Sequence, residues 1–518
     1  MTEAPHSPLD FGISLNSREY QYPHNENYRP EMESSLTSSS EEETDRTGGQ
    51  EPKVIVYQSC VLELFKMCQT CGSPINSTDI SYFGAQMRVK WDCLKGHNGT
   101  WTSSPEIHGM PEVDLLVASA VLFTGATITE LEDMSKVMNL KVISPTTFCG
   151  IQKAYLFPAI EQLYTLQRDQ ILERASIKQN LQLPQPPTSS EEVGEMHQPL
   201  PKLFHLSGNG RHDTFGSSSK YCCYTFTMDD TKEIIQTNLV QVTEISSSVA
   251  MEAEAFRHGL EAILDTGLKV GVVSTDRSPS IRRIMQEEYP RIKHQFDVLH
   301  TAKSFHKKML KAARKRGQGP LADWAKYVIN HMWFSSASCG ANSEELVRRW
   351  LGILHHVTDV HSWTTNGEEQ HCLHPQMSDG VRKKKKWLER GSLPYKVLSN
   401  LVQDKHLLRD FENMELFMHT GALEVFHSAV LKYMPKRQCP SYHGIRERGL
   451  LAVLEHNENI VKRRPATTKE GGLKMKQFFC QRTNQWAMKV VYQPHTHNFR
   501  QRLLEIVMAQ RQDPTLPY

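Results

Sequence analysis

The sequence Leu-Phe-His-Leu-Ser-Gly-Asn-Gly-Arg-His-Asp, residues 203–213, decides the fold. It has the pattern of a short apolar strand that stops at polar residues beside glycine. Val272–Arg277 repeats this pattern, and Gly421–Ser428 has the pattern of a helix with an acid in its first turn. Acids at two strand ends and on one helix can together hold two divalent cations. The first of these three places holds an amide, Asn209, in this chain.

The segments after residue 213 predict the rest of a sheet. Alternating apolar and polar residues, or short apolar runs between turns, indicate four further strands at 222–228, 234–242, 270–275 and around Phe296. Ser246–Ser248 can cap a helix that Gly267 ends, between the second and third of these strands. Three strands, a helix, a strand, a helix and a strand follow the order of the ribonuclease H-like α/β fold with its mixed sheet. In that fold the first strand and the strand after the first helix lie side by side.

The composition fits a chain with several folded units. Its 518 residues allow roughly three or four units of about 150 residues each, and a hydrophobic content of 39% is enough for real cores. Eleven cysteines in so long a chain indicate reduced thiols and metal ligation rather than a disulfide framework. The longest apolar run, Leu115–Phe123, is too short to span a bilayer. We therefore expect a soluble intracellular protein that does not enter membranes.

The net charge of +2 conceals an uneven distribution of charge. Residues 1–52 carry eleven acids and three arginines, a net charge of −8, and subtracting this from the total leaves +10 on the remaining chain. A modest basic excess is compatible with nucleic acid. The first 52 residues are rich in Ser, Glu, Pro and Asn and have no hydrophobic period, so we expect a disordered acidic tail.

Two pairs of soft ligands predict a zinc ribbon within residues 53–105. Cys68 and Cys71 are separated by 21 residues from a second pair, Cys93 and His97. Two such pairs on tight turns, each beside a glycine, are what tetrahedral zinc requires. The alternative is two unrelated cysteine pairs in a small core. A zinc with four protein ligands is structural, so we expect no catalysis here.

The segment between the ribbon and the sheet divides into helices and a linker. Residues 106–178 are expected to be helical, because apolar residues from Val113 to Val121 recur at helical spacing and Pro145 marks a later helix start. Residues 179–202 contain five prolines and an acidic Ser-Ser-Glu-Glu run. This composition predicts a linker that separates two domains.

Several of these runs together resemble the DDE transposases of animal cut-and-paste DNA transposons. The likeness extends from near Lys66 to about Tyr492, and its most specific part is His-Thr-Gly-Ala-Leu-Glu-Val-Phe-His-Ser at 419–428. The other matching runs are Gly-Asn-Gly-Arg-His-Asp at 208–213, Ser-Lys-Tyr at 219–221, Thr-Asp-Arg at 275–277, His-Gln-Phe-Asp-Val-Leu-His at 294–300 and Ala-Lys-Ser at 302–304. The resemblance implies a ribonuclease H-like core, two divalent ions such as magnesium or manganese, DNA cleavage and strand transfer, and action in the nucleus.

The same resemblance implies catalytic positions. Asp276 and Glu424 match the second and third acids of the family, and an aspartate is expected where this chain has Asn209. Magnesium is held by hard anionic oxygens, whereas asparagine offers only a neutral carbonyl. Two-metal cleavage needs shared carboxylates that hold the ions about 3.5–4 Å apart, so metal affinity and activity should fall together.

Each of these acids has a plainer alternative. Alternate residues from 209 onward share a face of an extended strand, so Asp213 can replace the missing ligand, or it can cap the loop that follows. Asp276 can cap the next helix, and Glu424 can be an ordinary solvated glutamate. Asp297 and His300 lie near the same sheet edge, where we expect them to form structural hydrogen bonds.

A long insertion, residues 303–415, is expected to be helical with its own core, because it contains five of the eight tryptophans. Its first helix carries basic residues that can bind DNA phosphates or an import receptor, namely Lys303, Lys307, Lys308, Lys311 and Arg314. Alternatively, these basic residues form an ordinary solvated helix face without a binding partner. His371, Cys372 and His374 with distant Cys339 form a second, unevenly spaced candidate zinc group.

The remaining chain completes the predicted core. Residues 416–495 contain the Glu424 helix, a helix at 442–461 and a hairpin of 474–480 with 486–492, and residues 496–518 form a last helix and tail. We predict a nuclear protein with DNA as partner, alone or as a homo-oligomer. Three hypotheses follow: a transposase-derived protein whose cleavage is impaired by Asn209, a competent nuclease that uses Asp213, and a host protein that only binds DNA or protein.

Overall fold

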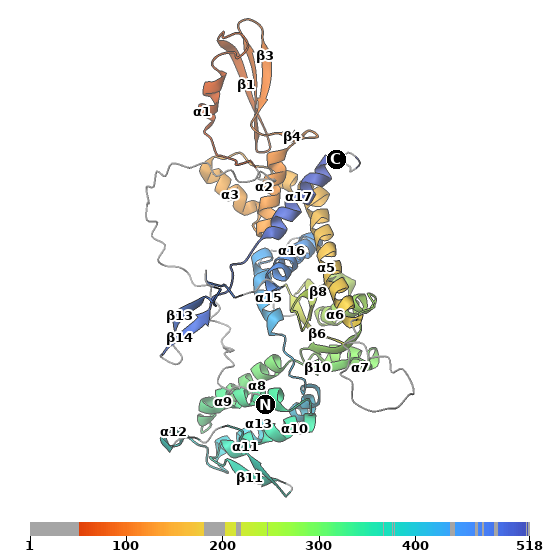
Figure 1. Ribbon diagram of the computed structural model, residues 1–518, viewed down its shortest axis with the longest axis vertical. Helices are drawn as coiled ribbons and strands as arrows, with labels where there is room; N and C mark the ends of the chain where they lie inside the picture. The colour runs from red at the N-terminus through yellow and green to blue at the C-terminus, as the bar shows by residue number, and fades with distance from the viewer. Residues whose placement is uncertain are drawn as a thin grey trace. The chain divides into compact units, whose positions relative to one another are not determined.

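Mixed α/β structure extends over the described part of the chain in a computed structural model (Figure 1). The described residues are 51–180, 203–213, 219–245, 247–365, 367–374, 377, 379–435, 441–461, 465–468, 471–480, 485–513 and 515. Two compact units divide between Pro105 and Glu106. Most of the predicted acidic tail, residues 1–50, lies outside the described residues.

A five-stranded sheet of order β10-β9-β6-β7-β8 organises the larger unit. Its antiparallel part consists of β6 (Phe204–His212), β7 (Tyr221–Met228) and β8 (Ile234–Gln241). Its parallel part adds β9 (Val270–Thr275) and β10 (Lys293–Phe296) to β6. The strands predicted from the sequence are therefore confirmed, and the strand before Asp276 lies beside the strand that contains Asn209.

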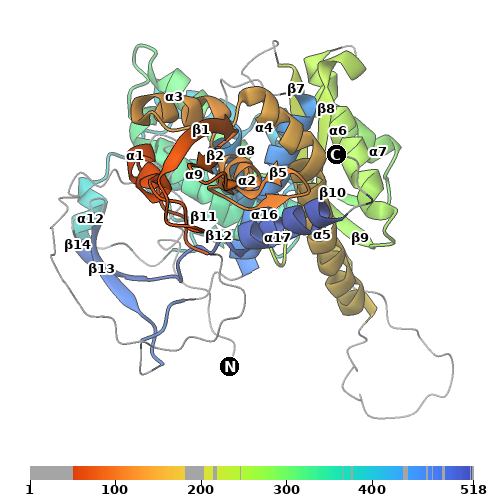
Figure 2. The same ribbon diagram turned by 90° about the horizontal axis from the view of Figure 1, so that it is seen from above.

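Helices pack on both sides of the edge strand β8, which contributes to two apolar cores. Ile234 and Ile235 are consecutive in β8, and each is buried in a different core. α6 (Ser248–Leu264) and α7 (Pro279–Glu287) contribute to the core of Ile235. α15 (Gly421–Tyr433) and α16 (Tyr442–Val461) contribute to the core of Ile234. Figures 1 and 2 show α6 and α16 on opposite sides of β8.

The predicted helical segment is present, but it is not a separate domain. It consists of α2 (Glu112–Thr124), α3 (Ile128–Met138), α4 (Pro145–Ile151), a π-helical turn (Gln152–Leu156) and α5 (Phe157–Asn180). Its apolar side chains share one core with α15, α16 and the last helix, α17 (Asn498–Gln512). This corrects the expectation of two domains on either side of a linker, most of which, residues 181–202, lies outside the described residues.

Local signals explain where these helices begin. Thr127 and Glu130 form a capping box at α3, and Ser144 caps α4 directly before Pro145. Ser247 accepts a hydrogen bond from the Ala250 N–H at the start of α6. Within the described residues, no helix combines the length and the apolar character needed to cross a membrane.

Asn457 of α16 fixes this helix to the edge strand β8. Its side chain accepts a hydrogen bond from the Ile234 N–H (2.8 Å) and donates one to the Ile234 carbonyl (2.9 Å). Asn457→Ala would leave both buried backbone groups without these partners, which should cost about 2–3 kcal/mol. We expect a melting temperature lower by roughly 4–8 °C in calorimetry. Asn400→Ala, at an exposed position of α13 (Leu393–Val402), is the control, and equal melting of the two variants would contradict this role.

The insertion after β10 is mainly helical and has buried tryptophans, as expected, with Trp324 and Trp350 only 2% and 0% exposed. Its helices are α8 (Val298–Ala313), α9 (Pro320–Ser338), α10 (Ser343–Leu351), α11 (Ile353–His356), α12 (Asp379–Lys384), α13 and α14 (Lys405–Asp410). It also contains a hairpin, β11 (Ser362–Thr365) with β12 (Glu368–His371), that the helical prediction missed. Gly367 has a φ of +84°, a conformation that favours such a turn over a helix.

The insertion is tied to the sheet through a shared carboxylate. Asp410 at the end of α14 accepts hydrogen bonds from Arg277, the second residue after β9, at 2.9 Å and from Arg282 of α7 at 2.6 Å. Asp410 is only 7% exposed, whereas the two arginine side chains are half-buried. This pair of contacts holds α14 near the end of the sheet where Asp276 lies.

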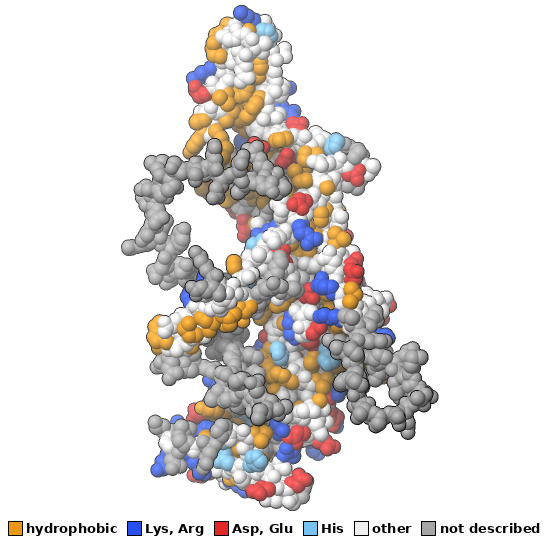
Figure 3. Space-filling model, viewed as in Figure 1, with side chains coloured by type: hydrophobic (Ala, Val, Ile, Leu, Met, Phe, Trp, Pro, Cys, Tyr) orange, Lys and Arg blue, Asp and Glu red, His pale blue; other side chains and the backbone are white. Residues whose placement is uncertain are grey.

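The predicted C-terminal hairpin consists of β13 (Met475–Cys480) and β14 (Gln485–Val490). Its surface is strongly apolar, as the orange side chains over this hairpin in Figure 3 show. Phe479, Trp486 and Met488 are 46%, 65% and 57% exposed.

The N-terminal unit contains a three-stranded antiparallel sheet of order β1-β2-β3. Its elements are α1 (Gln58–Leu62), β1 (Ile75–Phe83), β2 (Gln86–Cys93) and β3 (Asn98–Thr102). Met87 and Val89 of β2 are buried and form part of the small core of this unit. A short pair of strands, β4 (Glu106–Ile107) and β5 (Met110–Pro111), follows in the larger unit.

Candidate functional site

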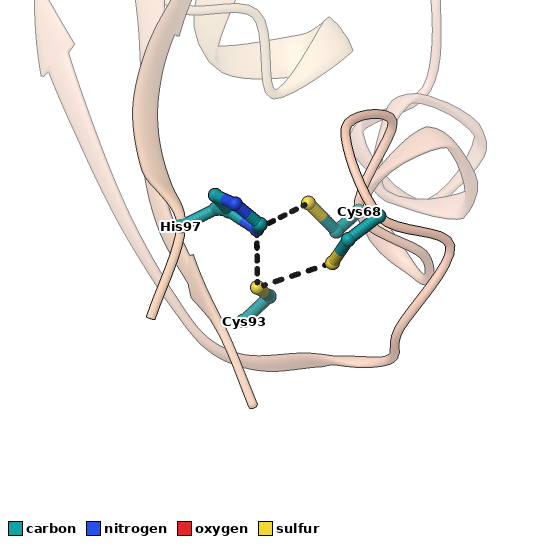
Figure 4. A group of neighbouring side chains, drawn as sticks. Cys68, Cys93 and His97 are labelled. Atoms are coloured by element: carbon teal, nitrogen blue, oxygen red, sulfur yellow. Dashed lines mark hydrogen bonds between the residues drawn. The ribbon is translucent and has the colours of Figure 1, made fainter. Parts of the chain in front are cut away.

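Four metal-ligating side chains come together in the N-terminal unit. Cys68 and Cys71 lie before β1, while Cys93 ends β2 and His97 directly precedes β3. The Sγ atoms of Cys71 and Cys93 are 3.8 Å apart, and His97 Nδ1 lies 3.6 Å from Cys93 Sγ and 4.0 Å from Cys68 Sγ. A tetrahedral zinc with Zn–S bonds of about 2.3 Å keeps its sulfurs roughly 3.8 Å apart. The four residues, three of which point toward one another in Figure 4, could therefore hold a metal such as zinc.

Two matching turns position these ligands. The Gly72 N–H donates to the Cys68 carbonyl at 2.8 Å, and the Gly96 N–H donates to the Cys93 carbonyl at 2.9 Å. Both glycines have positive φ, +66° and +81°, which other residues adopt only with strain. The sequence signal of a glycine beside each ligand pair thus corresponds to a real requirement of the backbone.

One ligand of this group is prepared for metal by its surroundings. The backbone N–H and the hydroxyl of Ser73 lower the pKa of Cys71 to about 6. The thiolate is the form of cysteine that binds metal, so these hydrogen bonds favour the ligating state at neutral pH.

The carboxyl edge of the larger sheet brings Asn209 and Asp276 together. β6 and β9 are parallel neighbours in which Ser207 pairs with Ser274, and Asn209 and Asp276 each lie two residues further on. Asn209 also pairs with Thr225 of β7 and is 9% exposed. The first two predicted positions therefore share one edge, as the strand order requires.

Asp276 contacts the backbone at the start of the next helix, the plainer role that the sequence allowed for it. Its carboxylate accepts a hydrogen bond from the Ser278 N–H at 3.2 Å, at the start of α7. Burial raises its pKa, and the nearby His300 partly offsets this rise. A buried acid of this kind is stabilised by a neighbouring cation, which is what a metal site at this edge would supply.

Glu424 faces this edge from the first turn of α15, but it is already bound to a cation. The Lys303 ammonium donates to both of its carboxylate oxygens at 2.6 Å. His300 Nε2 lies 3.6 Å from the same carboxylate. Lys303, predicted to bind DNA phosphates, is thus directed to an acid of the same protein.

Asp297 supports this arrangement from within the fold. It is fully buried, caps α8 through the Leu299 N–H at 2.7 Å, and binds His300 Nδ1 and the Thr420 hydroxyl. Burial opposes a charge on His300, but the hydrogen bond and charge of Asp297 raise its pKa overall. Asp297 and His300 therefore form the structural hydrogen bonds expected from the sequence. The bond from Asp297 also orients His300 toward Glu424.

Glu252 of α6 is a further acid at this edge that sequence reasoning missed. Its carboxylate lies so close to Gly210 that a Cβ added there would come within 2.5 Å of Oε1. Burial raises the pKa of Glu252 to about 7, and Asp276 adds to this rise. The only signal in the sequence was the glycine after Asn209, whose missing side chain makes room for Glu252.

Asp213, the proposed substitute ligand, is engaged in a turn. Its Oδ1 accepts hydrogen bonds from the Ser219 hydroxyl and from the N–H groups of Lys220 (3.2 Å) and Tyr221 (3.3 Å). This is the loop-capping role that the sequence allowed as an alternative. The four residues of the ribbon cluster place their ligand atoms within 4.8 Å of one another. Among the described residues, the acids of the sheet edge do not bring even three such atoms that close together.

The predicted basic row lies on α8 and at its end. Lys307, Lys308, Lys311 and Arg314 are exposed, and in the described part of the chain none of them forms an ion pair. Lys307, Lys311 and Arg314 are four and three residues apart, so they share one face of the helix. These side chains can reach an anionic partner.

No protein-family model matches this chain, and no curated protein sequence matches it.

Proposed function

We propose that this chain is a transposase-derived, DNA-binding nuclear protein with a ribonuclease H-like core whose DNA cleavage and strand transfer are impaired. The sheet order β10-β9-β6-β7-β8 supports this core, because three antiparallel strands are joined by two parallel ones on the side of the first strand. The helix α6 between β8 and β9 also has the place that this fold requires. The edge with Asn209 and Asp276 is then the catalytic edge.

The proposal rests mainly on the position of α8, which runs from the acidic sheet edge to the exposed basic row. This helix begins directly after β10, and its first two turns place His300 and Lys303 against Glu424. The exposed cations of the basic row continue along the same helix for roughly 16 Å beyond Lys303. DNA phosphates bound along this row would bring the duplex to the acidic edge.

Two features support impaired cleavage. Asn209 supplies a neutral amide where the reaction needs an anionic ligand, so a magnesium or manganese pair would be bound weakly. Lys303 already neutralises Glu424 through both carboxylate oxygens, so a metal would have to displace an ammonium group. The zinc ribbon, with four protein ligands and no open position, would have a structural role.

One observation favours a second candidate, a metal-dependent nuclease. Glu252 lies beside Gly210 and interacts electrostatically with Asp276, so its carboxylate could replace the acid missing at Asn209. Its raised pKa means that a metal would have to displace a proton there near neutral pH. This candidate replaces the version based on Asp213, whose carboxylate is engaged in the turn.

The salt dependence of DNA binding tests the proposed interface. Simultaneous replacement of Lys307, Lys308, Lys311 and Arg314 by alanine should weaken binding to any duplex. It should also flatten the slope of log K against log salt by up to about 3.6, since each neutralised phosphate contributes about 0.9. Fluorescence anisotropy with an arbitrary labelled duplex at several salt concentrations measures both effects.

A charge-matched variant controls for net charge alone. Lys90, Lys153, Lys396 and Lys476 are exposed lysines on four other elements, and their replacement by alanine removes the same charge. We expect this variant to keep most of the original slope. Equal slopes in the two variants would show that α8 is only a solvated face, and an unaltered chain that binds no DNA would refute the proposed function.

A further inference from the structure

A second cluster of metal ligands lies in the insertion, beside the β11–β12 hairpin. His356 ends α11 and His361 directly precedes β11, while Cys372 and His374 follow β12. One ligand atom from each of the four lies within 4.8 Å of the other three. All four side chains are half-buried, and the base of the hairpin is closed by a hydrogen bond from the Cys372 N–H to the His361 carbonyl at 2.9 Å.

The membership of this cluster differs from the group predicted from the sequence. Cys372 and His374 belong to it, but the adjacent His371 is exposed and does not. Cys339 is also outside it, because its buried thiol lies against the carbonyls of Ser336 (3.2 Å) and Glu415 (3.3 Å). The two ligands that the group predicted from the sequence lacked are His356 of α11 and His361 of the turn after it. They lie 16 and 11 residues before Cys372.

The geometry of the cluster fits a tetrahedral ion. The ring centroids of His356, His361 and His374 are 5.0, 5.0 and 5.1 Å apart, and the rings are nearly perpendicular, at 77°, 84° and 87°. A tetrahedral zinc with Zn–N bonds of about 2.0–2.1 Å would place its imidazole rings roughly 5 Å apart. The Sγ of Cys372 lies 3.5 Å from His356 Nδ1 and completes the set.

One imidazole is oriented as metal-bound histidines are. His361 Nε2 lies 3.2 Å from Asp359 Oδ1, and Arg382 holds this carboxylate through both oxygens at 2.8 and 2.9 Å. The other nitrogen, His361 Nδ1, is buried and has no hydrogen-bond partner among the described residues. Carboxylate partners of this kind fix the ring of a ligating histidine and leave its second nitrogen for the metal.

The local fold is built to bring these residues together. Asp359 has a φ of +63°, a left-handed conformation that costs free energy in a residue other than glycine and turns the chain back toward His356. Trp363 of β11 stacks on His355 with centroids 4.6 Å apart, and it approaches Gly352 so closely that a Cβ there would come within 3.1 Å of its ring. The hairpin is therefore packed on α11 beside the cluster.

The electrostatic surroundings favour a neutral imidazole and oppose an isolated thiolate. Burial, with Lys385 as a second cause, lowers the pKa of His356 to about 3. Burial raises the pKa of Cys372 to about 11. The nearby Lys385 ammonium, which lies over the rings of Trp324 and Trp387 at 5.2 and 5.0 Å, opposes a further cation, while Asp359 and a Cys372 thiolate offset its charge.

We propose that His356, His361, Cys372 and His374 bind one structural zinc ion that fastens the β11–β12 hairpin to α11. Three imidazoles and a thiolate favour a transition-metal dication over magnesium or calcium. Binding forms one Zn–S and three Zn–N bonds, and the thiol proton of Cys372 leaves to solvent. Four protein ligands leave no open position, so the ion stabilises and does not catalyse. This inference does not depend on the proposed DNA binding.

Metal counting on the full chain tests the proposal. Protein from zinc-supplemented medium, purified without chelators, should contain two zinc ions per chain by mass spectrometry of the metal. Cys372→Ser should contain one, Cys68→Ser in the ribbon should contain one, and the double variant should contain none. His371→Ala, which removes the exposed neighbouring imidazole, should still contain two.

Cobalt provides a readout that identifies the ligands. Cys68→Ser protein loaded with cobalt should show the absorption of a tetrahedral cobalt with a thiolate ligand, and adding Cys372→Ser should remove it. If Cys372→Ser fails to fold, the counts in the unaltered chain and in Cys68→Ser still decide the matter. An unaltered chain with one zinc, a Cys68→Ser variant with none, or a Cys372→Ser variant that keeps two would overturn the proposal.

Discussion

Asn209→Asp is expected to raise manganese- or magnesium-dependent nicking of supercoiled DNA by about 10–100-fold or more. The substitution places an anionic oxygen beside Asp276, on the sheet edge that Glu424 faces. Loss of an outer partner of a metal ligand already costs about 10–100-fold in metal affinity or activity, so a direct ligand should matter at least as much. The measurement is the rate at which closed plasmid becomes open circles at fixed metal concentration.

Further substitutions in the Asn209→Asp background show whether the gain comes from a metal centre. Glu424→Gln or Asp276→Asn should return nicking to the original level, with little change in DNA affinity, because neither residue belongs to the basic row. Asp213→Asn should leave the gain intact, since Asp213 closes a turn. Strong nicking by the unaltered chain that disappears with Asp213→Asn would instead make Asp213 the working ligand.

Cys68→Ser should unfold the N-terminal ribbon. Within the described residues 53–105, only four hydrophobic side chains are buried, namely Cys68, Met87, Val89 and Cys93. Two of these are proposed ligands, so the unit has almost no core without a metal. Structural zinc contributes roughly 10–16 kcal/mol in small domains, which exceeds what so few buried groups can supply. We expect loss of one zinc equivalent and rapid cleavage of residues 54–105 by protease.

The ribbon variant has a close control. Cys60→Ser removes an exposed cysteine of the same unit that is not part of the cluster. This variant should keep its zinc and its protease resistance, and the melting of the larger unit should be the same in both variants. A Cys68→Ser protein that retains all its zinc would refute the ligand assignment, and retained protection without zinc would refute the structural role of the metal.

The features that were predictable from the sequence depend on short-range patterns. The alternation in 222–228 identifies the side chains of β7 that belong to one apolar core, namely Cys222, Tyr224, Phe226 and Met228. A strand run followed by a capped helix is likewise visible within about ten residues. The ribbon ligands were predictable for the same reason, because each pair lies on one tight turn. Asn209 and Asp276 were placed correctly because parallel neighbouring strands end at the same edge.

The features that were missed depend on contacts between distant residues. Glu252 lies on a helix face that an amphipathic pattern marks only as half-buried, and its role depends on Gly210, 42 residues earlier. The second cluster needed His356 and His361 from a different helix and turn than Cys372. The helical segment before the linker was assigned to its own domain, because its apolar stripe does not reveal that α15, α16 and α17 cover it.

The ion pair between Lys303 and Glu424 was also not predictable from the sequence. A run of lysines on one helix predicts a common partner, yet the first of them lies one turn closer to the sheet edge than the rest. At that position Glu424 is within reach, whereas the cations from Lys307 onward remain exposed. Position along one helix therefore separates a residue of the acidic edge from a candidate DNA contact.

We infer above all that the unaltered chain binds DNA but cuts it only weakly. The most direct measurement incubates a supercoiled plasmid with the unaltered protein and manganese at low salt, and determines bound and nicked DNA from the same samples. We expect a salt-sensitive complex in which nearly all of the plasmid stays closed. Efficient metal-dependent nicking by the unaltered chain that is abolished by Asp276→Asn would contradict this inference.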